Sequence, residues 1–177
     1  MPLETGAKLR EGDSYRLKEG FAQFDTAKGA IFTLEAPCKI ELIGENAVKL
    51  TRGKLVGLVL NEQARGFLVR TPHMAVTDLG TRFGVDVSDS DLATVHVLEG
   101  EVEIASVSEN PDTVPMRLVA GQAASASKHD PSIRTIKYEP RRFSAMIDTT
   151  YQPPDYVLAY WRFEEGEPGT KVPDTSA

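Results

Sequence analysis

Apolar and polar residues alternate with a period of two over several stretches of this chain, and this pattern constrains the fold more than any other feature. Residues 30–36 read AIFTLEA, with apolar residues at the even positions, and residues 83–87 read FGVDV, with apolar residues at the odd positions. Residues 94–104 continue the pattern. A period of two places the apolar side chains on one face of a half-buried strand. Turn-forming clusters separate these stretches at short intervals, so the sequence predicts an all-β fold of short strands.

An apolar residue followed three positions later by glycine recurs along the chain and predicts corners between strands. These units end at Gly12, Gly20, Gly53, Gly100 and Gly121. Glycine adopts positive φ angles at little steric cost, which suits a tight change of direction. Repeated corners fit either hairpins in a sandwich or the stacked coils of a short β-solenoid, and their unequal spacing leaves both open. Of the two, we favour solenoid-like layers.

One segment, residues 140–147, has a helical pattern. Proline is tolerated at its first turn, and Phe143, Met146 and Ile147 fall on one stripe. We expect a short C-terminal helix that closes an end of the β core. The sequence QPPD at 152–155 then predicts a stiff, extended spacer. The chain therefore divides into an all-β domain at 1–140, a helix and linker at 141–155, and a separate element at 156–177.

Composition narrows the class of protein. The formal net charge of -6 repels phosphate backbones, and Arg141-Arg142 is the only pair of adjacent cations, so we expect no nucleic-acid partner. The single Cys38 excludes an intrachain disulfide and a structural zinc site built on several thiolates, and we expect it to be a buried filler. No apolar run is long enough to span a membrane, and the first residues lack a signal-peptide pattern. We expect a soluble chain, which an excised piece of a larger protein would also be.

Residues 71–87, TPHMAVTDLGTRFGVDV, carry the densest group of chemically active side chains. One hypothesis is a reaction centre that pairs His73 with Asp78. The other is a tight corner between two strands, in which Gly80 supplies unusual backbone angles and Thr81 satisfies a freed amide. Arg82 and Asp86 then share the face opposite the core. The corner accounts for every residue, and we favour it.

No pattern in the chain supports catalysis or metal binding. The three histidines, His73, His96 and His129, are scattered, and His96 lies between two valines on a face that we expect to be solvated. Glu101 and Glu103 share the outer face of a strand. The sequence contains no phosphate loop, dinucleotide fingerprint or nucleophile elbow. We expect a protein that is not an enzyme, with no catalytic residue, metal ligand or cofactor.

Three ordered segments carry a family resemblance. They are TP…V…DLGTRFGVDV at 71–87, TVHVLEGEVEI at 94–104 and LVAGQA at 118–123. In order and spacing they resemble the FecR-type domain of bacterial extracytoplasmic regulators. The earlier segment GDSYRLKEGFAQFDTAKGAIFTLEAP looks like the start of the same domain in the form common in planctomycete-like bacteria. The similarity extends over roughly residues 5–140.

The resemblance implies a non-enzymatic, all-β module outside the inner membrane, usually tethered by a preceding membrane helix. In iron-uptake regulators such a domain passes a signal from an outer-membrane receptor to a cytoplasmic sigma factor. The chain departs from this pattern in two ways. His73-Met74 follows Thr71-Pro72 where the family often has glycine, and the membrane helix and the sigma-binding segment are absent from this chain. The signalling role therefore rests on analogy.

The C-terminal tail carries a second resemblance. The segment VLAYWRFEEG at 157–166, followed by VPDTS at 172–176, looks like the opening strand of a laminin-G or concanavalin-like domain. A lone strand cannot bury its apolar face, so Trp161 and Phe163 must either dock on the preceding core or remain mobile. This resemblance implies that the parent protein continues into a glycan-binding or adhesive domain.

Three hypotheses of function follow. The favoured one is a periplasmic regulatory domain of FecR type that binds a receptor or sigma regulator, with Arg82, Asp86 and His96 as its candidate interaction surface beside structural corners at Gly80, Thr81 and Gly100. The alternative is a cell-surface module that binds carbohydrate itself or positions an adjoining laminin-G-like domain. The third is a metal-dependent hydrolase that uses His73 or His96.

Overall fold

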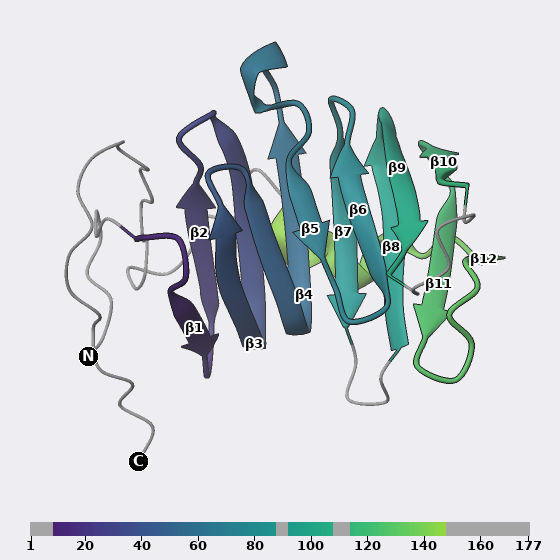
Figure 1. Ribbon diagram of the computed structural model, residues 1–177, viewed down its shortest axis with the longest axis horizontal. Helices are drawn as coiled ribbons and strands as arrows, with labels where there is room; N and C mark the ends of the chain where they lie inside the picture. Colours follow the sequence, from purple (N-terminus) through teal and green to yellow (C-terminus); the bar gives the residue numbers. More distant parts are fainter. Residues whose placement is uncertain (1–8, 88–91, 108–113, 148–177) are drawn as a thin grey trace.

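Twelve β-strands and one short helical segment make up the part of the chain that the computed structural model describes, which is residues 9–87, 92–107 and 114–147 (Figure 1). The strands are β1 (Ser14–Leu17), β2 (Phe21–Asp25), β3 (Ala30–Gly44), β4 (Ala47–Val59), β5 (Leu68–Arg70), β6 (Met74–Asp78), β7 (Arg82–Val87), β8 (Leu92–Glu99), β9 (Glu101–Ser106), β10 (Met116–Val119), β11 (Ala123–Ser127) and β12 (Arg134–Ile136). A 3-10 turn, η1 (Glu62–Ala64), precedes β5, and a second, η2 (Pro140–Phe143), continues into α1 (Ser144–Ile147). The prediction of an all-β fold with one short C-terminal helix is confirmed.

The long strand β4 is the point where the sheet divides. One edge of β4 pairs with β3 over most of its length. On the other edge, Ala47–Lys49 pair with β5 in parallel, whereas Gly53–Leu58 pair with β7 in the antiparallel sense. Register shifts in the β3–β4 ladder lie between these two parts of β4, and irregularities of this kind bend a strand and increase its twist. Two branches therefore leave one strand, in the orders β4-β5-β6-β9-β10 and β4-β7-β8-β11-β12.

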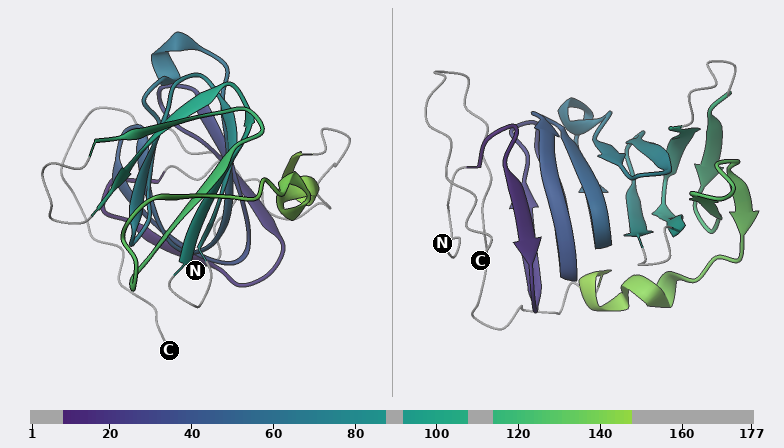
Figure 2. Two further views of the ribbon diagram at one scale, coloured as in Figure 1. Left: turned by 90° about the vertical axis from the view of Figure 1, so that its right-hand side faces the viewer. Right: turned by 60° about the horizontal axis from the view of Figure 1, so that its bottom comes forward.

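The two branches lie over each other and form two layers. Figure 1 shows β6 in front of β7 and β9 in front of β8, and the end-on view in Figure 2 shows the sheet curled around its interior. Consecutive strands enter the layers two at a time, so that β5 and β6 lie in one branch and β7 and β8 in the other. Val76 and Ile104 from one branch are buried in the same core cluster as Val85 and Val95 from the other. The apolar faces that the sequence predicts thus meet between the layers.

The antiparallel pairing decides what kind of layers these are. Every strand pairing except that of β4 with β5 is antiparallel. The layers accordingly grow along the molecule by addition of antiparallel pairs, whereas the coils of a regular β-solenoid stack in parallel. The structure combines the progressive layering of one alternative with the hairpins of the other.

The corners at Gly80 and Gly100 touch each other. Both glycines have positive φ angles, 105° and 74°. A Cβ added to Gly100 would lie 2.6 Å from the carbonyl oxygen of Gly80. The Thr81 hydroxyl donates a hydrogen bond to the carbonyl oxygen of Glu101. This contact fixes the turn between β6 and β7 against the turn between β8 and β9, and so ties the two layers together.

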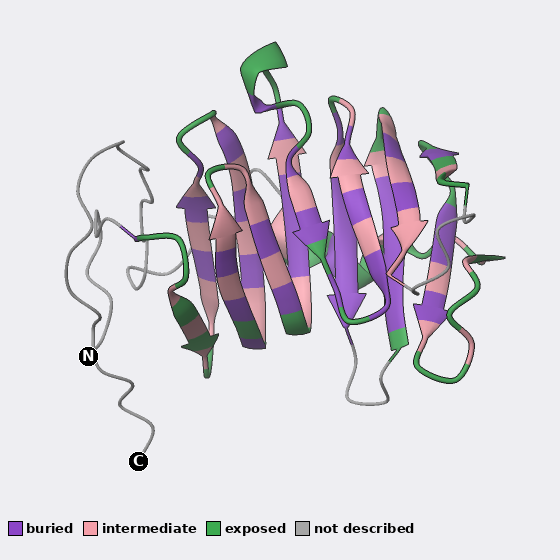
Figure 3. Cartoon of the chain, viewed as in Figure 1, coloured by how far each residue is buried: buried purple, intermediate pink, exposed green. Residues whose placement is uncertain are grey.

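Burial differs between strands of the same sheet. Most strands alternate buried and less buried residues, as half-buried strands should, but β7 is buried from Phe83 to Val87 and β8 from Ala93 to Val97 (Figure 3). Both faces of these two strands are therefore covered. The inner face meets the other layer, and the outer face lies under the C-terminal helical segment, which crosses a face of the sheet and does not close an end of it as the sequence predicted (Figure 2).

Two further findings complete the description. Among the described residues, no helix has the length and apolar character needed to cross a membrane. The predicted spacer at 152–155 and the predicted lectin-like strand within 156–177 lie outside the described residues.

The glycine corners give a stability prediction. Gly53 (φ 97°) and Gly66 (φ 81°) both need positive φ, but a Cβ on Gly53 would lie 2.5 Å from the carbonyl oxygen of Pro37, whereas one on Gly66 would meet nothing within 4 Å. We expect Gly66→Ala to destabilise the protein by about 1–2 kcal/mol through backbone strain alone. Gly53→Ala should lower the free energy of unfolding by at least about 1 kcal/mol more. Urea unfolding of the two variants measures the difference, and equal losses would show that the β3–β4 contact is looser than described.

Candidate interaction surface

The candidate surface is the outer face of β7 and β8. Arg82, Gly84 and Asp86 alternate with Phe83, Val85 and Val87, which belong to the core, so the first three side-chain positions face outward. On β8, His96 lies directly opposite Gly84. Asp86 lies opposite Lys54 of β4. The ladders therefore bring Arg82, Asp86 and His96 to one face, as the period of two predicts.

This face is covered by the chain itself. Residues 137–147, which we call the C-terminal segment, run across it from the β12 end of the molecule toward β3 (Figure 2). Phe143 is fully buried, and its ring lies on Gly84, where an added Cβ would be 2.7 Å from the ring atoms. The ring centroid of Phe143 is 5.5 Å from that of His96, and the two planes are inclined at 58°. The missing side chain at Gly84 thus creates the space that the aromatic ring fills.

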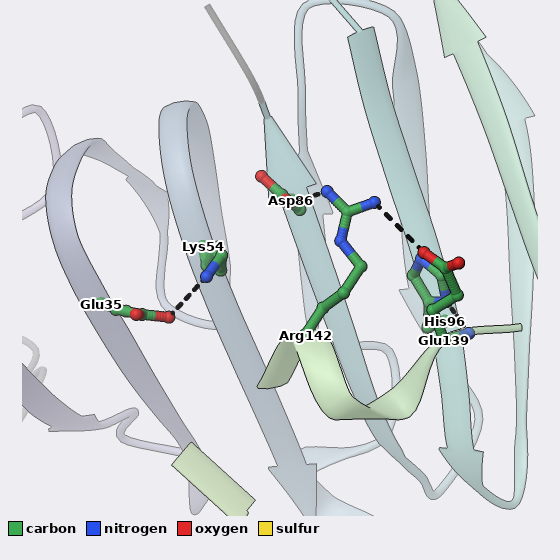
Figure 4. Close-up of polar contacts among 6 residues, drawn as sticks. All are labelled: Glu35, Lys54, Asp86, His96, Glu139 and Arg142. Atoms are coloured by element: carbon green, nitrogen blue, oxygen red, sulfur yellow. Dashed lines mark hydrogen bonds and ion pairs between the residues drawn. The ribbon is translucent and has the colours of Figure 1, made fainter. Parts of the chain in front are cut away.

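Polar contacts hold the segment on either side of that ring (Figure 4). Arg142 Nη2 is 2.5 Å from Asp86 Oδ2. The backbone N–H of Glu139 donates a hydrogen bond of 3.2 Å to His96 Nδ1. Arg142 Nη1 is also 3.9 Å from Glu139 Oε2. Because Asp86 is 7% exposed, the ion pair with Arg142 compensates a charge that burial would otherwise disfavour strongly.

The hydrogen bond to His96 defines the state of its ring. Since Nδ1 accepts from Glu139, the neutral ring carries its proton on Nε2. Burial lowers the pKa of His96, and the Arg142 charge lowers it further, while Glu139 and Asp86 act in the opposite direction. The neutral form is therefore the one that the site accommodates. Protonation would place a hydrogen on the nitrogen that accepts from Glu139.

The expectation that this face is solvated is wrong for two of its three residues. His96 is fully buried and Asp86 nearly so, and only Arg82 remains half-buried, 3.2 Å from Glu99. The reason is a tertiary contact across 43 residues to His96 and across 56 residues to Asp86. A local alternation pattern contains no information about a cover of that kind. The apolar stripe that included Phe143 was the one signal in the sequence that this segment needed a surface to pack on.

The structure separates the residues of the reaction-centre hypothesis. His73 and Asp78 lie at opposite ends of β6. Asp78 Oδ2 accepts a hydrogen bond of 2.7 Å from the backbone N–H of Gly80, and burial raises the pKa of Asp78 although this bond, Thr81 and Arg65 oppose the shift. The Thr71 hydroxyl accepts from the backbone N–H groups of His73 and Met74, which closes the turn before β6. Asp78 and Thr71 thus have identifiable structural roles at the two turns.

A search for metal-binding groups gives no candidate within the described residues. No three of their His, Cys, Asp and Glu side chains lie together so that they could hold an ion. Cys38 is buried beneath β1, and burial raises its pKa to about 12.

Comparison with known proteins adds a family and a fold. The family model described as FecR protein matches residues 40–103, which extend from the middle of β3 to β9 and include the branch point in β4. Two crystal structures, at 1.65 and 2.50 Å resolution, of a "putative anti-sigma factor" from Parabacteroides distasonis ATCC 8503 share the fold, with TM-scores of 0.61 and 0.60. Each match is 20% identical in sequence and covers 77% of this chain and 65% of that chain. No curated protein matches the sequence.

The packing of Phe143 on Gly84 gives a prediction that a double-mutant cycle can test. Phe143→Ala should lower the free energy of unfolding by about 3 kcal/mol, because it removes a buried ring. Gly84→Ala should lower it by about 1–3 kcal/mol, because the new methyl group overlaps that ring. In the double variant the methyl group meets no ring, so the combined loss should fall short of the sum by at least about 1 kcal/mol. Additive losses in urea unfolding would mean that the ring does not lie on Gly84.

The buried His96 gives a pH dependence. Its folded-state pKa lies below the ordinary value of 6.5, so the unfolded chain binds the proton more readily, and stability rises with pH in this window. The contribution of His96 is complete above pH 6.5 and is lost as the pH falls through the lowered pKa of the folded state. We expect His96→Asn, which does not titrate, to reduce this acid sensitivity. Equilibrium unfolding across this range measures it, the exposed His129→Asn is the matched control, and identical pH profiles for wild type and His96→Asn would contradict the assignment.

Proposed function

We propose that this chain is a FecR-like regulatory domain of an anti-sigma-type signalling protein, that it acts outside the inner membrane, and that it works by binding another protein. The observation that carries the proposal is the FecR family match over residues 40–103, which contain the branch point of the sheet. The fold shared with a "putative anti-sigma factor" supports the same class. In the parent protein, a membrane helix outside this chain would tether the domain.

The outer face of β7 and β8 is the proposed interaction surface. It already binds a peptide segment, since Gly84 receives an aromatic ring and Asp86 receives a guanidinium group. Arg82 lies at the rim of the covered area and remains half-buried beside Glu99. A partner would contact Arg82 and the exposed side of the C-terminal segment, or would take the place of that segment. In either case the readout is binding, because each polar side chain on the face positions a neighbour.

The roles of the acidic and basic side chains support a non-enzymatic function. Asp78 accepts from the turn amide of Gly80, and His96 accepts from the backbone of Glu139. Asp86 is paired with Arg142. A catalytic acid or base must reach a reacting group, whereas each of these three contacts a neighbouring part of the same chain.

Binding experiments with purified components test the proposal. The partner to use is the periplasmic signalling domain of the receptor encoded beside the gene for this protein, titrated by calorimetry. We expect saturable binding that Arg82→Ala weakens by about fivefold, a typical loss for one rim contact. Arg117→Ala is the matched control, because Arg117 pairs with Glu101 on the other branch of the sheet.

Two outcomes would contradict the proposal. The first is no binding to the receptor domain together with saturable binding on a glycan array, which would favour the carbohydrate-binding alternative. The second is binding that both arginine variants weaken equally, which would move the interaction away from the outer face of β7 and β8.

A further inference from the structure

Three cations lie side by side across the first strands of the sheet. The register places Arg16 of β1 directly opposite Lys39 of β3, and Lys39 directly opposite Arg52 of β4. Neighbouring strands are about 4.8 Å apart, so the row is about 10 Å long. We call these three residues the cationic row. All three are exposed, and the residues beside them in β1 and β3 point the other way, toward the core.

This arrangement is unfavourable for an isolated sheet. Like charges directly opposite each other on neighbouring strands repel and destabilise the pairing. In the described part of the chain, no acidic side chain forms an ion pair with Arg16 or Lys39. The row also belongs to a chain whose formal net charge is -6, so its positive charge is local. An anionic group placed over the row would relieve the repulsion.

The flanks of the row define the shape of that anionic group. On one side, Glu41 lies 3.4 Å from Lys49, and on the other, Glu35 lies 2.9 Å from Lys54. These pairs balance their own charges, so the excess positive charge is confined to a narrow line across the strands. A bilayer surface would press on the flanking carboxylates as well as on the row, and the charge of the whole chain would repel it. A narrow ligand meets the row alone.

We propose that the cationic row binds an extended acidic segment of a partner protein that runs across β1, β3 and β4. In an extended chain, side chains at alternate positions point the same way and are about 6.8 Å apart. Two carboxylates at alternate positions therefore fit a row of about 10 Å. This inference takes from the proposed function only that the partner is a protein, and it concerns a different surface.

A direct binding measurement tests the cationic row. The probe is a short fluorescein-labelled peptide of alternating glutamate and serine, followed by fluorescence anisotropy, with the glutamine-serine peptide as the uncharged control. We expect the acidic peptide to bind at low ionic strength and to dissociate near 1 M salt, where the Debye length is only about 3 Å. Lys39→Gln should weaken binding by about threefold, as expected for one exposed charge contact. Lys49→Gln, whose charge Glu41 already balances, should have a smaller effect.

The stability of the free protein supplies a second readout. Lys39→Gln removes the central charge of the row, so it should leave the chain at least as stable as the wild type and make its unfolding midpoint less dependent on salt. A merely structural lysine would give the opposite result, a loss of stability.

Several results would overturn the inference. They are no binding of the acidic peptide, equal weakening by Lys39→Gln and Lys49→Gln, and row-dependent binding to phosphatidylglycerol vesicles without binding to the peptide. Each would leave the receptor titration with Arg82→Ala unaffected, so failure of this inference is distinguishable from failure of the proposed function.

Discussion

The division of β4 between two partners is the constraint on which the rest of the structure depends. One stretch of its edge pairs with β5 and a later stretch pairs with β7, so a single continuous strand begins two branches. Because the branches curl over each other, each strand of the pair β7 and β8 has one face against the other layer. The close approach of Gly53 to β3 lies at this division, which explains why a side chain there would disturb both ladders.

The outer face of β7 and β8 is where this architecture meets function. A sheet face that carries Gly84, Asp86 and His96 cannot be buried without partners for its charge and its imidazole, and the C-terminal segment supplies both. The same groups that make this face a receptor for the protein's own segment make it suitable for another segment of similar chemistry. The cationic row lies on different strands, so the sheet offers two surfaces with opposite requirements: one accepts an aromatic and a guanidinium group, the other an acid.

Local physics explains what the sequence predicted well. Alternation fixes which side chains of a strand share a face, and it correctly placed Arg82, Gly84 and Asp86 together. Glycine marks where backbone angles are unusual, which is how Gly80 and Gly100 stood out. The choice between sandwich and solenoid was not accessible, because a corner specifies a turn but not which branch the next strand joins. The burial of His96 was missed for a related reason, since its cover is distant in sequence.

The central claim is that the C-terminal segment is a cover held on a sheet that is stable without it. One aromatic contact, one ion pair and one backbone hydrogen bond hold the segment, whereas β7 is held by a ladder on each side, so the segment should open with a smaller free energy. Residue-resolved amide hydrogen exchange measures this directly. The account predicts that the amide of Glu139, bound to His96, exchanges well before the ladder amides of β7. Equal opening free energies for Glu139 and β7 would contradict it, because the segment would then be released only when the whole sheet unfolds.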